Sequence, residues 1–233
     1  MITPFKPTDK ILVLDFDHTC YDTDSFLLFE IRLPMLARFN IPVKKWEEAY
    51  ESSAKIGYSL EVHLQELNKI MNSSPCSLED IQAFGKSIKF SEYLYSDVFS
   101  FLKEAKEKGY KILLLSFGYP DWQEKKVLGV GLSKLVDKVI YVNKHGDKAE
   151  MIKKYAGASS KLIFVDNNGH ELDKAQRELP QVETYFMKRT PEHAMNAKDD
   201  EEIRVRYLES RKMAETKSVY QHKICHSLSD VIL

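Results

Sequence analysis

The sequence predicts an α/β fold, a doubly wound (Rossmann-like) parallel sheet joined to a small helical domain. Three observations lead to this prediction. Short apolar runs alternate with amphipathic helical patterns over most of the chain. The runs consist of unbroken Val, Ile and Leu, which is typical of parallel strands buried on both faces. One interval, about 23–95, interrupts this alternation and carries helical patterns alone.

The first element is the apolar strand that precedes Asp15, and five more such runs follow it. The six predicted strands cover residues 11–14, 111–116, 138–142, 161–165, 183–187 and 223–225. Helical patterns lie between them at 97–108, 121–127, 148–155 and 172–178. Gly109 follows the first of these helices, where a C-cap glycine is common. This order of elements predicts βαβ units and hence a parallel sheet.

The interruption is predicted to be a separate domain, because amphipathic patterns at 26–39, 43–56 and 60–71 cannot extend a sheet. Ser77 begins a further helix as its capping residue. We therefore expect residues 1–22 and 96–233 to form the α/β core and residues 23–95 the helical domain. A charge-rich stretch, 190–221, is predicted to contain a solvated surface helix over 200–214.

Composition favours a cytoplasmic protein. The chain has 233 residues, 43% of them hydrophobic and 30% charged, and a net charge of −1, which disfavours nucleic-acid binding through bulk electrostatics. No apolar run approaches the roughly 20 residues that span a bilayer, and the first residues lack the apolar stretch of a secretory signal. The three cysteines are few and odd in number, which argues against a disulfide framework. We expect neither a membrane nor a nucleic acid as partner.

Polar residues follow four of the predicted strands. Because the carboxyl ends of parallel strands meet at one edge of a sheet, these residues are expected to converge where ligands bind. They are Asp15, Asp17 and Thr19 after the first strand, Ser116 with Phe117-Gly118 after the second, Lys148 at a helix start after the third, and Asp166-Asn167 after the fourth.

These residue types suit phosphoryl transfer. A carboxylate can attack phosphorus, a second can move the proton, and a hydroxyl with a lysine can hold the phosphoryl oxygens. Few protein oxygens beside a phosphate make a Mg²⁺ site. Taken alone, Asp15 and Asp17 are equally compatible with a strand-ending turn, whose side chains bond nearby amides. The joint placement of all four strand ends favours the catalytic interpretation.

The four segments resemble the motifs of the haloacid dehalogenase superfamily of phosphohydrolases, in the family's order. Asp15-Phe-Asp-His-Thr19 is similar to its first motif, DxDxT, directly after an apolar strand. Ser116 matches the second motif, Lys148 the third, and Asp166-Asn167 the fourth, acidic motif. The resemblance covers about 11–172 and implies a helical cap inserted after the first strand, which corresponds to 23–95.

The resemblance implies a role for each matched residue. Asp15 would be the nucleophile and a Mg²⁺ ligand. Asp17 would be the general acid and base, with its backbone carbonyl on the metal. Lys148 would neutralise Asp15 and the transferring phosphoryl. Thr19 would support the loop that holds Asp17, and we count it among the substrate-binding residues.

The phosphoryl itself would be bound by Ser116 with the backbone amides of Phe117 and Gly118. The fourth motif departs from the commonest pattern of two adjacent acids or a Gly-Asp pair. Asp166 or Asn167 would then ligate Mg²⁺, and the other would bond Lys148 or a metal-bound water. The family's later acid would come from one of two residues, Glu171 or Asp173.

A cap of this kind encloses small substrates and excludes water, so substrate choice would reside there. Candidate cap contacts are Tyr21, Asp24, Phe26, Arg32 and Tyr58. Arg32 could bind a second anionic group of the substrate, although a solvated helix arginine is the more ordinary interpretation.

The leading hypothesis is a Mg²⁺-dependent phosphatase that hydrolyses a small phosphorylated metabolite through an aspartyl-phosphate, as a monomer or homodimer. A phosphomutase and a non-catalytic binding or regulatory protein of the same fold are the alternatives. A dehalogenase should lack the acid/base at position 17. A transport ATPase would need membrane helices. A zinc site at 222–226 is disfavoured because Cys225 and His226 would point to opposite faces of a strand.

Overall fold

The computed structural model describes residues 3–53, 57–72, 76–144, 146–190 and 218–233. Its centre is a six-stranded sheet in the order β3-β2-β1-β4-β5-β6, and every strand pair is parallel. The strands are β1 (Lys10–Leu14), β2 (Tyr110–Phe117), β3 (Lys138–Val142), β4 (Lys161–Asp166), β5 (Glu183–Met187) and β6 (Lys223–Cys225). The predicted α/β fold and all six predicted strands are confirmed.

Strand β1 lies at the middle of the sheet and decides where a ligand can bind. It pairs with β2 on one side and with β4 on the other, so the strand order reverses there. Its four apolar residues are fully buried, as two covered faces require. At such a reversal the connections leave in opposite directions, and a crevice opens at the carboxyl ends of the strands.

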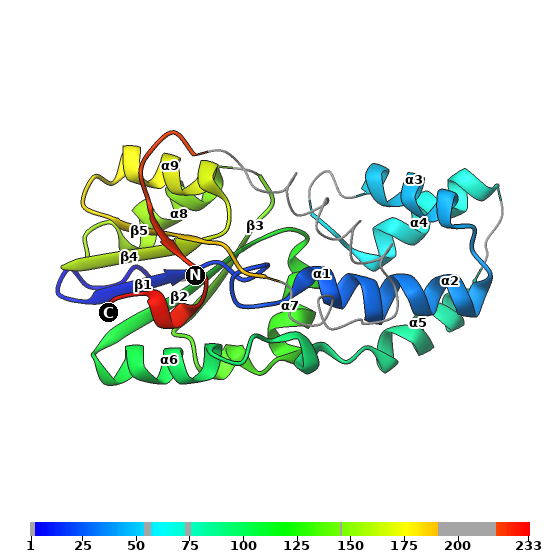
Figure 1. The fold of residues 1–233 in the computed structure, drawn as a ribbon, viewed down its shortest axis with the longest axis horizontal. Coiled ribbons are helices and arrows are strands. Elements are labelled where there is room, and N and C mark those ends of the chain that lie inside the picture. Colours follow the sequence, from blue (N-terminus) through cyan, green and yellow to red (C-terminus); the bar gives the residue numbers. More distant parts are fainter. Residues whose placement is uncertain (1–2, 54–56, 73–75, 145, 191–217) are drawn as a thin grey trace.

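Helices cover both faces of the sheet (Figure 1). Helices α6 (Val98–Glu107) and α7 (Pro120–Gly129) pack on one face, in the core cluster that contains Leu12 and Leu14. Helices α8 (Asp147–Ala156) and α9 (Gly169–Glu178) cover the other face, in the cluster that contains Ile11 and Val13. The alternation of side chains along β1 therefore divides the core into two layers. All four helices predicted between the strands are confirmed, with ends shifted by a few residues.

The interval after β1 is helical, as expected. Its elements are α1 (Thr23–Phe26), the π-helix η1 (Leu27–Arg32), α2 (Leu33–Phe39), α3 (Val43–Ser53), α4 (Leu60–Met71), α5 (Leu78–Ser87) and the 3₁₀-helix η2 (Phe90–Tyr93). The described residues of this interval form no β-strand. Figure 1 shows α2 to α5 beyond the end of the sheet. We call this part the helical segment, and its status as a cap domain over 23–95 stays a prediction.

Local chemistry explains two boundaries in this segment. Ser77 and Asp80 form a capping box at the start of α5, with each side chain bonded to the other's backbone amide. Pro34 lies just after the π-helix η1, inside a helical run that is continuous from Thr23 to Phe39, so its missing amide hydrogen interrupts the hydrogen bonding where η1 gives way to α2. The predicted Ser77 cap is confirmed.

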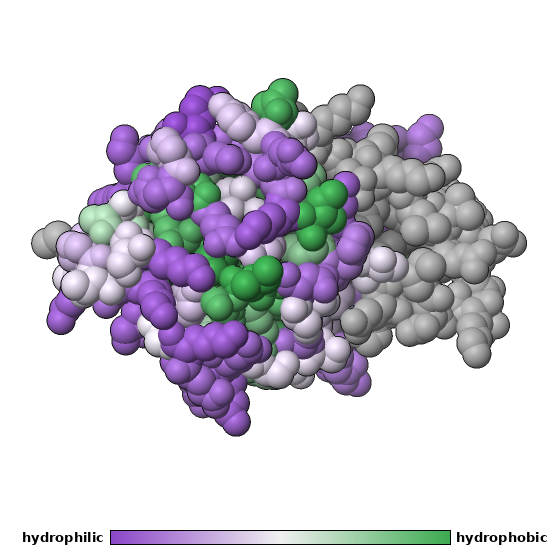
Figure 2. All heavy atoms as spheres, turned by 60° about the vertical axis from the view of Figure 1, so that its left-hand side comes forward, coloured by the Kyte–Doolittle hydropathy of each residue, from purple (hydrophilic) through white to green (hydrophobic). Residues whose placement is uncertain are grey.

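Three further expectations concern the chain as a whole. Cys20, Cys76 and Cys225 are all buried free thiols, so no disulfide forms, as expected. No helix in the described part of the chain has both the length and the apolar character needed to cross a bilayer. One face of the molecule is mostly hydrophilic, with smaller hydrophobic areas (Figure 2). The predicted helix over 200–214 lies outside the described residues.

The carboxylate of Asp173, on α9, holds the segment that leads into β6. It accepts hydrogen bonds from the Ser218 hydroxyl at 2.6 Å and from the Val219 and Tyr220 amides at 2.9 and 3.1 Å. The His222 Nε2 lies 2.8 Å away. Burial raises the pKa of Asp173, but these four hydrogen bonds outweigh it and lower the pKa to about 2. His222 thus has a structural partner, in keeping with the rejection of a zinc site.

We expect Asp173→Asn to destabilise the fold at pH 7 by about 2 kcal/mol, from a pKa difference of nearly two units. The folded-state pKa is below the ordinary value of 3.8, so the stabilisation is present above about pH 4 and is lost as the pH falls toward 2. Urea denaturation of both proteins between pH 7 and pH 3 measures it.

The control is Glu124→Gln, on the exposed face of α7, which should change stability by less than about 0.5 kcal/mol. Equal stability of wild type and Asp173→Asn at pH 7 would contradict the assigned role. So would a difference between them that does not shrink at pH 3.

Candidate active site

Three residues from separate strand ends meet at the carboxyl edge of the sheet. The Lys148 ammonium, in the first turn of α8, lies 2.5 Å from Asp15 Oδ1 and 2.7 Å from Asp166 Oδ2. All three side chains are almost fully buried. The sequence predicted that these residues would converge, and the structure brings them together.

The charges of this group do not balance. Burial raises the pKa of Asp15 to about 7, and the nearby Asp166 adds to the rise while Lys148 opposes it. Burial likewise raises the pKa of Asp166. Burial alone would lower the pKa of Lys148, but the two carboxylates outweigh it and raise that pKa. Two buried carboxylates thus share one ammonium, and this excess of negative charge would favour the binding of a further cation beside them.

The loop after β1 turns sharply at His18, whose φ of 60° lies in the left-handed region. This turn places the Thr19 hydroxyl 3.0 Å from Asp15 Oδ2, to which it donates. We expected Thr19 to contact substrate and to support the loop that holds Asp17. Its hydroxyl is instead fully buried and orients Asp15, which corrects its assignment as a substrate-binding residue.

Arg189 holds this loop from the far side, a role that the sequence did not reveal. Its Nε donates to the Thr19 carbonyl at 2.9 Å. Its two terminal nitrogens form a bidentate pair with Asp97, at 2.9 and 2.7 Å. Asp97 also accepts the Leu228 amide, so the same pair anchors the C-terminal residues.

Asp17 has three hydrogen-bond partners. Its carboxylate accepts bonds from the Thr23 hydroxyl, from Gln123 Nε2 at 2.7 Å and from the ammonium of Lys126. Burial raises the pKa of Asp17, but the charge and hydrogen bond of Lys126 outweigh it, so the pKa lies below its ordinary value. Asp17 is therefore held as a carboxylate.

Lys126 is 1% exposed and is the main feature that the sequence analysis missed. Its ammonium lies 4.9 Å from the centre of the Tyr21 ring and 5.2 Å from that of Phe16. Gln123 and Lys126 are three residues apart on α7 and so share a face. The only signal in the sequence was a lysine on the face of this helix that also carries the buried Trp122.

The two residues of the fourth motif, Asp166 and Asn167, have different surroundings. Asp166 is fully buried, and its second oxygen accepts the Asn168 amide at 2.7 Å, so this residue is the one that bonds Lys148. Asn167 instead faces the cavity described below. Glu171 also lines that cavity, whereas Asp173 holds the C-terminal segment and is excluded as the later acid.

The second motif is only partly as expected. The Ser116 hydroxyl is buried and has no hydrogen-bond partner among the described residues, which is unusual for a buried polar group. A phosphoryl oxygen would satisfy it. The Gly118 amide, however, donates to the Val142 carbonyl at 2.8 Å, so the expectation that it binds the phosphoryl is wrong in this structure. Phe117 lines the cavity.

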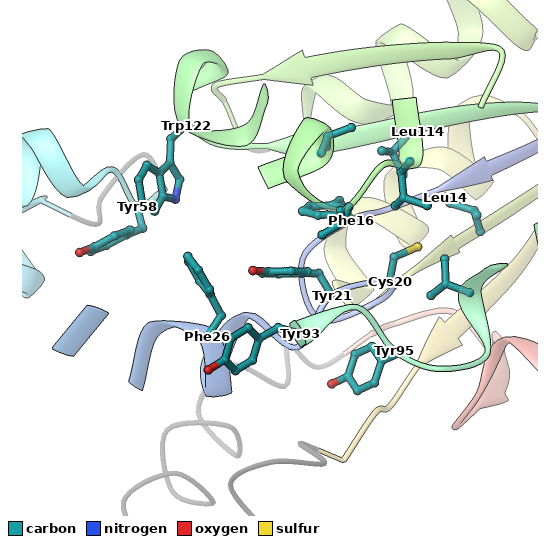
Figure 3. Packing of buried hydrophobic residues seen from close by; sticks show 14 of the residues in the cluster. Leu14, Phe16, Cys20, Tyr21, Phe26, Tyr58, Tyr93, Tyr95, Leu114 and Trp122 are labelled. Atoms are coloured by element: carbon teal, nitrogen blue, oxygen red, sulfur yellow. The ribbon is translucent and has the colours of Figure 1, made fainter. Parts of the chain in front are cut away.

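A cavity of about 230 Å³ lies between these residues and the helical segment. Asp15, Asp17, Lys126, Lys148 and Asn167 line one side of it. Leu27, Tyr50, Gly57, Tyr58 and Trp122 also line it. Figure 3 shows Tyr58 next to Trp122, at the end of a band of aromatic side chains that begins beside β1.

Two of the five candidate contacts from the helical segment are in place. Asp24 and Tyr58 line the cavity, whereas Tyr21 and Phe26 are buried in the core. Arg32 is bound to Glu47, with Nε and a terminal nitrogen 2.9 and 2.8 Å from the same carboxylate oxygen. Arg32 is not among the residues that line the cavity, so it is not a substrate contact there.

A divalent cation fits the donors at the edge of the sheet. The described residues contain no preformed cluster of three or more His, Cys, Asp or Glu side chains. Mg²⁺ needs fewer protein ligands than that, because it keeps several waters or phosphate oxygens. The Asp15 carboxylate, the Asp17 carbonyl and the Asn167 amide oxygen are hard donors of the kind it prefers, and the excess of negative charge favours it.

Comparison with known proteins identifies the family of the chain. A sequence model described as haloacid dehalogenase-like hydrolase matches residues 12–178. The chain belongs to this family. No curated protein matches the sequence.

Solved structures of haloacid dehalogenase-like proteins share the fold. One from Burkholderia xenovorans LB400, described as a haloacid dehalogenase-like hydrolase, has a TM-score of 0.73 at 16% identity and covers 96% of this chain and 95% of its own. L-2-haloacid dehalogenase from Xanthobacter autotrophicus, with chloropropionic acid covalently bound, has a TM-score of 0.59 at 18% identity and covers 96% of each chain. At these identities the likeness shows the fold alone.

We expect Lys126→Met to raise the pKa of Asp17, because the substitution keeps the length of the side chain and removes its charge. A titration of the Asp17 carboxyl followed by ¹³C NMR measures the pKa in both proteins. Lys125→Met, at the neighbouring exposed position whose lysine pairs with Glu61, is the matched control and should leave it unchanged. An Asp17 pKa that is the same in wild type and Lys126→Met would contradict the electrostatic account.

Proposed function

We propose that this haloacid dehalogenase-like hydrolase is a Mg²⁺-dependent phosphatase that hydrolyses a small phosphorylated metabolite through an aspartyl-phosphate on Asp15. One observation carries the proposal. Asp15 lines the cavity while Lys148 and Thr19 bind its two oxygens, and the neighbouring strand β2 carries the buried Ser116 hydroxyl, which has no partner among the described residues. A nucleophile fixed in orientation at the wall of a cavity suits phosphoryl transfer.

In the first step a carboxylate oxygen of Asp15 attacks phosphorus, and the bond from phosphorus to the ester oxygen breaks. The leaving oxygen takes a proton from the carboxyl of Asp17, which it leaves as a carboxylate. Lys148 and the Ser116 hydroxyl bind the phosphoryl oxygens as their charge rises. When bound, Mg²⁺ would neutralise the phosphoryl charge that the surplus of carboxylates would otherwise repel.

In the second step Asp17 accepts a proton from water, whose oxygen attacks phosphorus and breaks the bond to Asp15. The products are inorganic phosphate and the free Asp15 carboxylate. Lys126 favours this step, since it keeps Asp17 in the carboxylate form that a base requires. The first step needs Asp17 to be protonated. Lys126 disfavours that form, because it lowers the pKa of Asp17.

The other candidates differ in what the same residues do. A phosphomutase would return the phosphoryl group to its substrate and not to water. A haloacid dehalogenase would use Asp15 against carbon and would have no leaving oxygen for Asp17 to protonate. A binding protein would not need Asp15 to be oriented by two partners. A cytoplasmic location stays a prediction from the sequence.

We expect 4-nitrophenyl phosphate to be hydrolysed in the presence of Mg²⁺, and Asp15→Asn to reduce turnover at least about 10³-fold, because the amide cannot form the intermediate. EDTA should abolish turnover, and added Mg²⁺ should restore it. Release of phosphate measures the rate. Turnover that survives in Asp15→Asn would exclude the nucleophile, and release of chloride from 2-chloropropionate without phosphatase activity would favour a dehalogenase.

Asp17→Asn should lower kcat by about 10²- to 10⁴-fold, the usual contribution of a general acid and base. Mg²⁺ affinity should change little, because the proposed ligand at this position is a backbone carbonyl. Steady-state kinetics and calorimetric titration with Mg²⁺ measure the two effects separately. Equal losses of turnover and metal affinity would argue against the acid/base role.

A further inference from the structure

Three aromatic side chains line the same cavity as Asp15, and we define Tyr50, Tyr58 and Trp122 as its aromatic wall. Tyr50 comes from α3, Tyr58 from the chain just before α4, and Trp122 from α7. The ring centres of Tyr50 and Tyr58 are 5.7 Å apart, and Trp122 meets Tyr58 edge-on at the same distance. The wall thus joins the helical segment to the α/β core, and Figure 3 shows its Tyr58 and Trp122 side by side.

The wall is rigid as well as apolar. Tyr58 and Trp122 are at most 8% exposed. The Tyr58 hydroxyl is 3.2 Å from His63 Nδ1, so its polar end is already occupied. Behind Trp122 lie Phe26 and Phe90, with ring centres 6.2 and 6.1 Å away. A flat group that enters beside these rings would find fixed aromatic surfaces and would lose little to reorganisation.

The charged groups of the described lining disfavour a second anion. Its two lysines, Lys126 and Lys148, are both bound to carboxylates. Asp24 and Glu171 add two carboxylates to the lining, and among the described lining residues the only other basic group, His18, lies 3.3 Å from Asp24. A substrate with a carboxylate or a second phosphate would therefore meet acids and no uncommitted lysine or arginine among the described lining residues.

The volume sets a further limit. A cavity of about 230 Å³ is smaller than the roughly 300–1,000 Å³ that encloses a drug-sized ligand. A phosphoryl group beside Asp15 would take part of this volume, and a group about the size of one ring would fit the remainder. Leu27 and Phe117 add apolar surface to the lining.

We propose that the aromatic wall is the leaving-group subsite, and that it selects phosphate monoesters whose leaving group is one uncharged ring over esters that carry a second anionic group. This inference rests on the proposed phosphatase function. It names the substrate class, which is set by stacking and by the absence of an available cation among the described lining.

Three substrates separate the contributions. Phenyl phosphate has the ring alone, 4-carboxyphenyl phosphate has the same ring with a second anion, and ethyl phosphate has no ring. The carboxylate makes the phenol a slightly better leaving group, so chemical reactivity alone favours the charged ester. We expect kcat/KM for phenyl phosphate to exceed that for 4-carboxyphenyl phosphate by about 10-fold or more.

Ethyl phosphate has a poorer leaving group, so it serves as the reference within each variant. Trp122→Leu should lower kcat/KM for phenyl phosphate about 10-fold, mainly through KM, and should change that for ethyl phosphate less than about 2-fold. Tyr50→Ala, at a partly exposed position less needed for folding, should act in the same direction. Phe84→Leu is the matched control, because Phe84 is buried in α5 and does not line the cavity.

The outcomes are distinguishable. If none of the three esters is hydrolysed with Mg²⁺, the proposed function fails and the inference fails with it. If they are hydrolysed but 4-carboxyphenyl phosphate is preferred, only the inference is overturned. It is also overturned if a folded Trp122→Leu or Tyr50→Ala protein loses activity equally on all three esters. A selective loss on phenyl phosphate, absent in Phe84→Leu, supports it.

Discussion

The placement of the Lys148 ammonium between Asp15 and Asp166 is the interaction on which the rest of the site depends. Burying two carboxylates at the ends of adjacent strands is costly unless a cation lies within hydrogen-bond distance of both. That cation can come only from an element that starts beside the sheet edge. The first turn of α8 meets this condition, so the position of this helix determines how the two buried carboxylates are neutralised.

The same constraint explains Lys126. Asp17 is the third carboxylate at this edge, and it bonds Lys126, whereas Lys148 bonds Asp15. A second buried lysine, from α7 on the other face of the sheet, binds it, with the rings of Phe16 and Tyr21 beneath the ammonium. Each face of the sheet thus contributes one helix and one lysine. Three carboxylates against two lysines leave the negative excess that suits a divalent cation and a phosphate.

The sequence was informative where a local pattern determines the structure. Unbroken apolar runs predicted the strands, and parallel strands must bring Asp15, Lys148 and Asp166 to one edge. The sequence was uninformative where the role of a residue depends on a hydrogen-bond or ion-pair partner that is distant in the chain. Arg32 was predicted as a substrate contact, but it forms an ion pair with Glu47. The Gly118 amide was predicted to donate a hydrogen bond to the phosphoryl group, but it donates to the Val142 carbonyl. Lys126 and Arg189 were missed because nothing near them in the sequence marks their buried partners.

Two glycines connect the helical segment to the acid/base residue. A Cβ on Gly57 would lie 2.7 Å from the Gly118 Cα, and a Cβ on Gly118 would lie 2.8 Å from Gln123 Nε2. Both glycines have positive φ, at 96° and 136°, so neither backbone would accept a side chain without strain. That Gln123 nitrogen donates to Asp17. The same nitrogen also donates to the Phe117 carbonyl, directly before Gly118. The Gln123 side chain therefore links the close approach of Gly57 to Gly118 with the position of the Asp17 carboxylate.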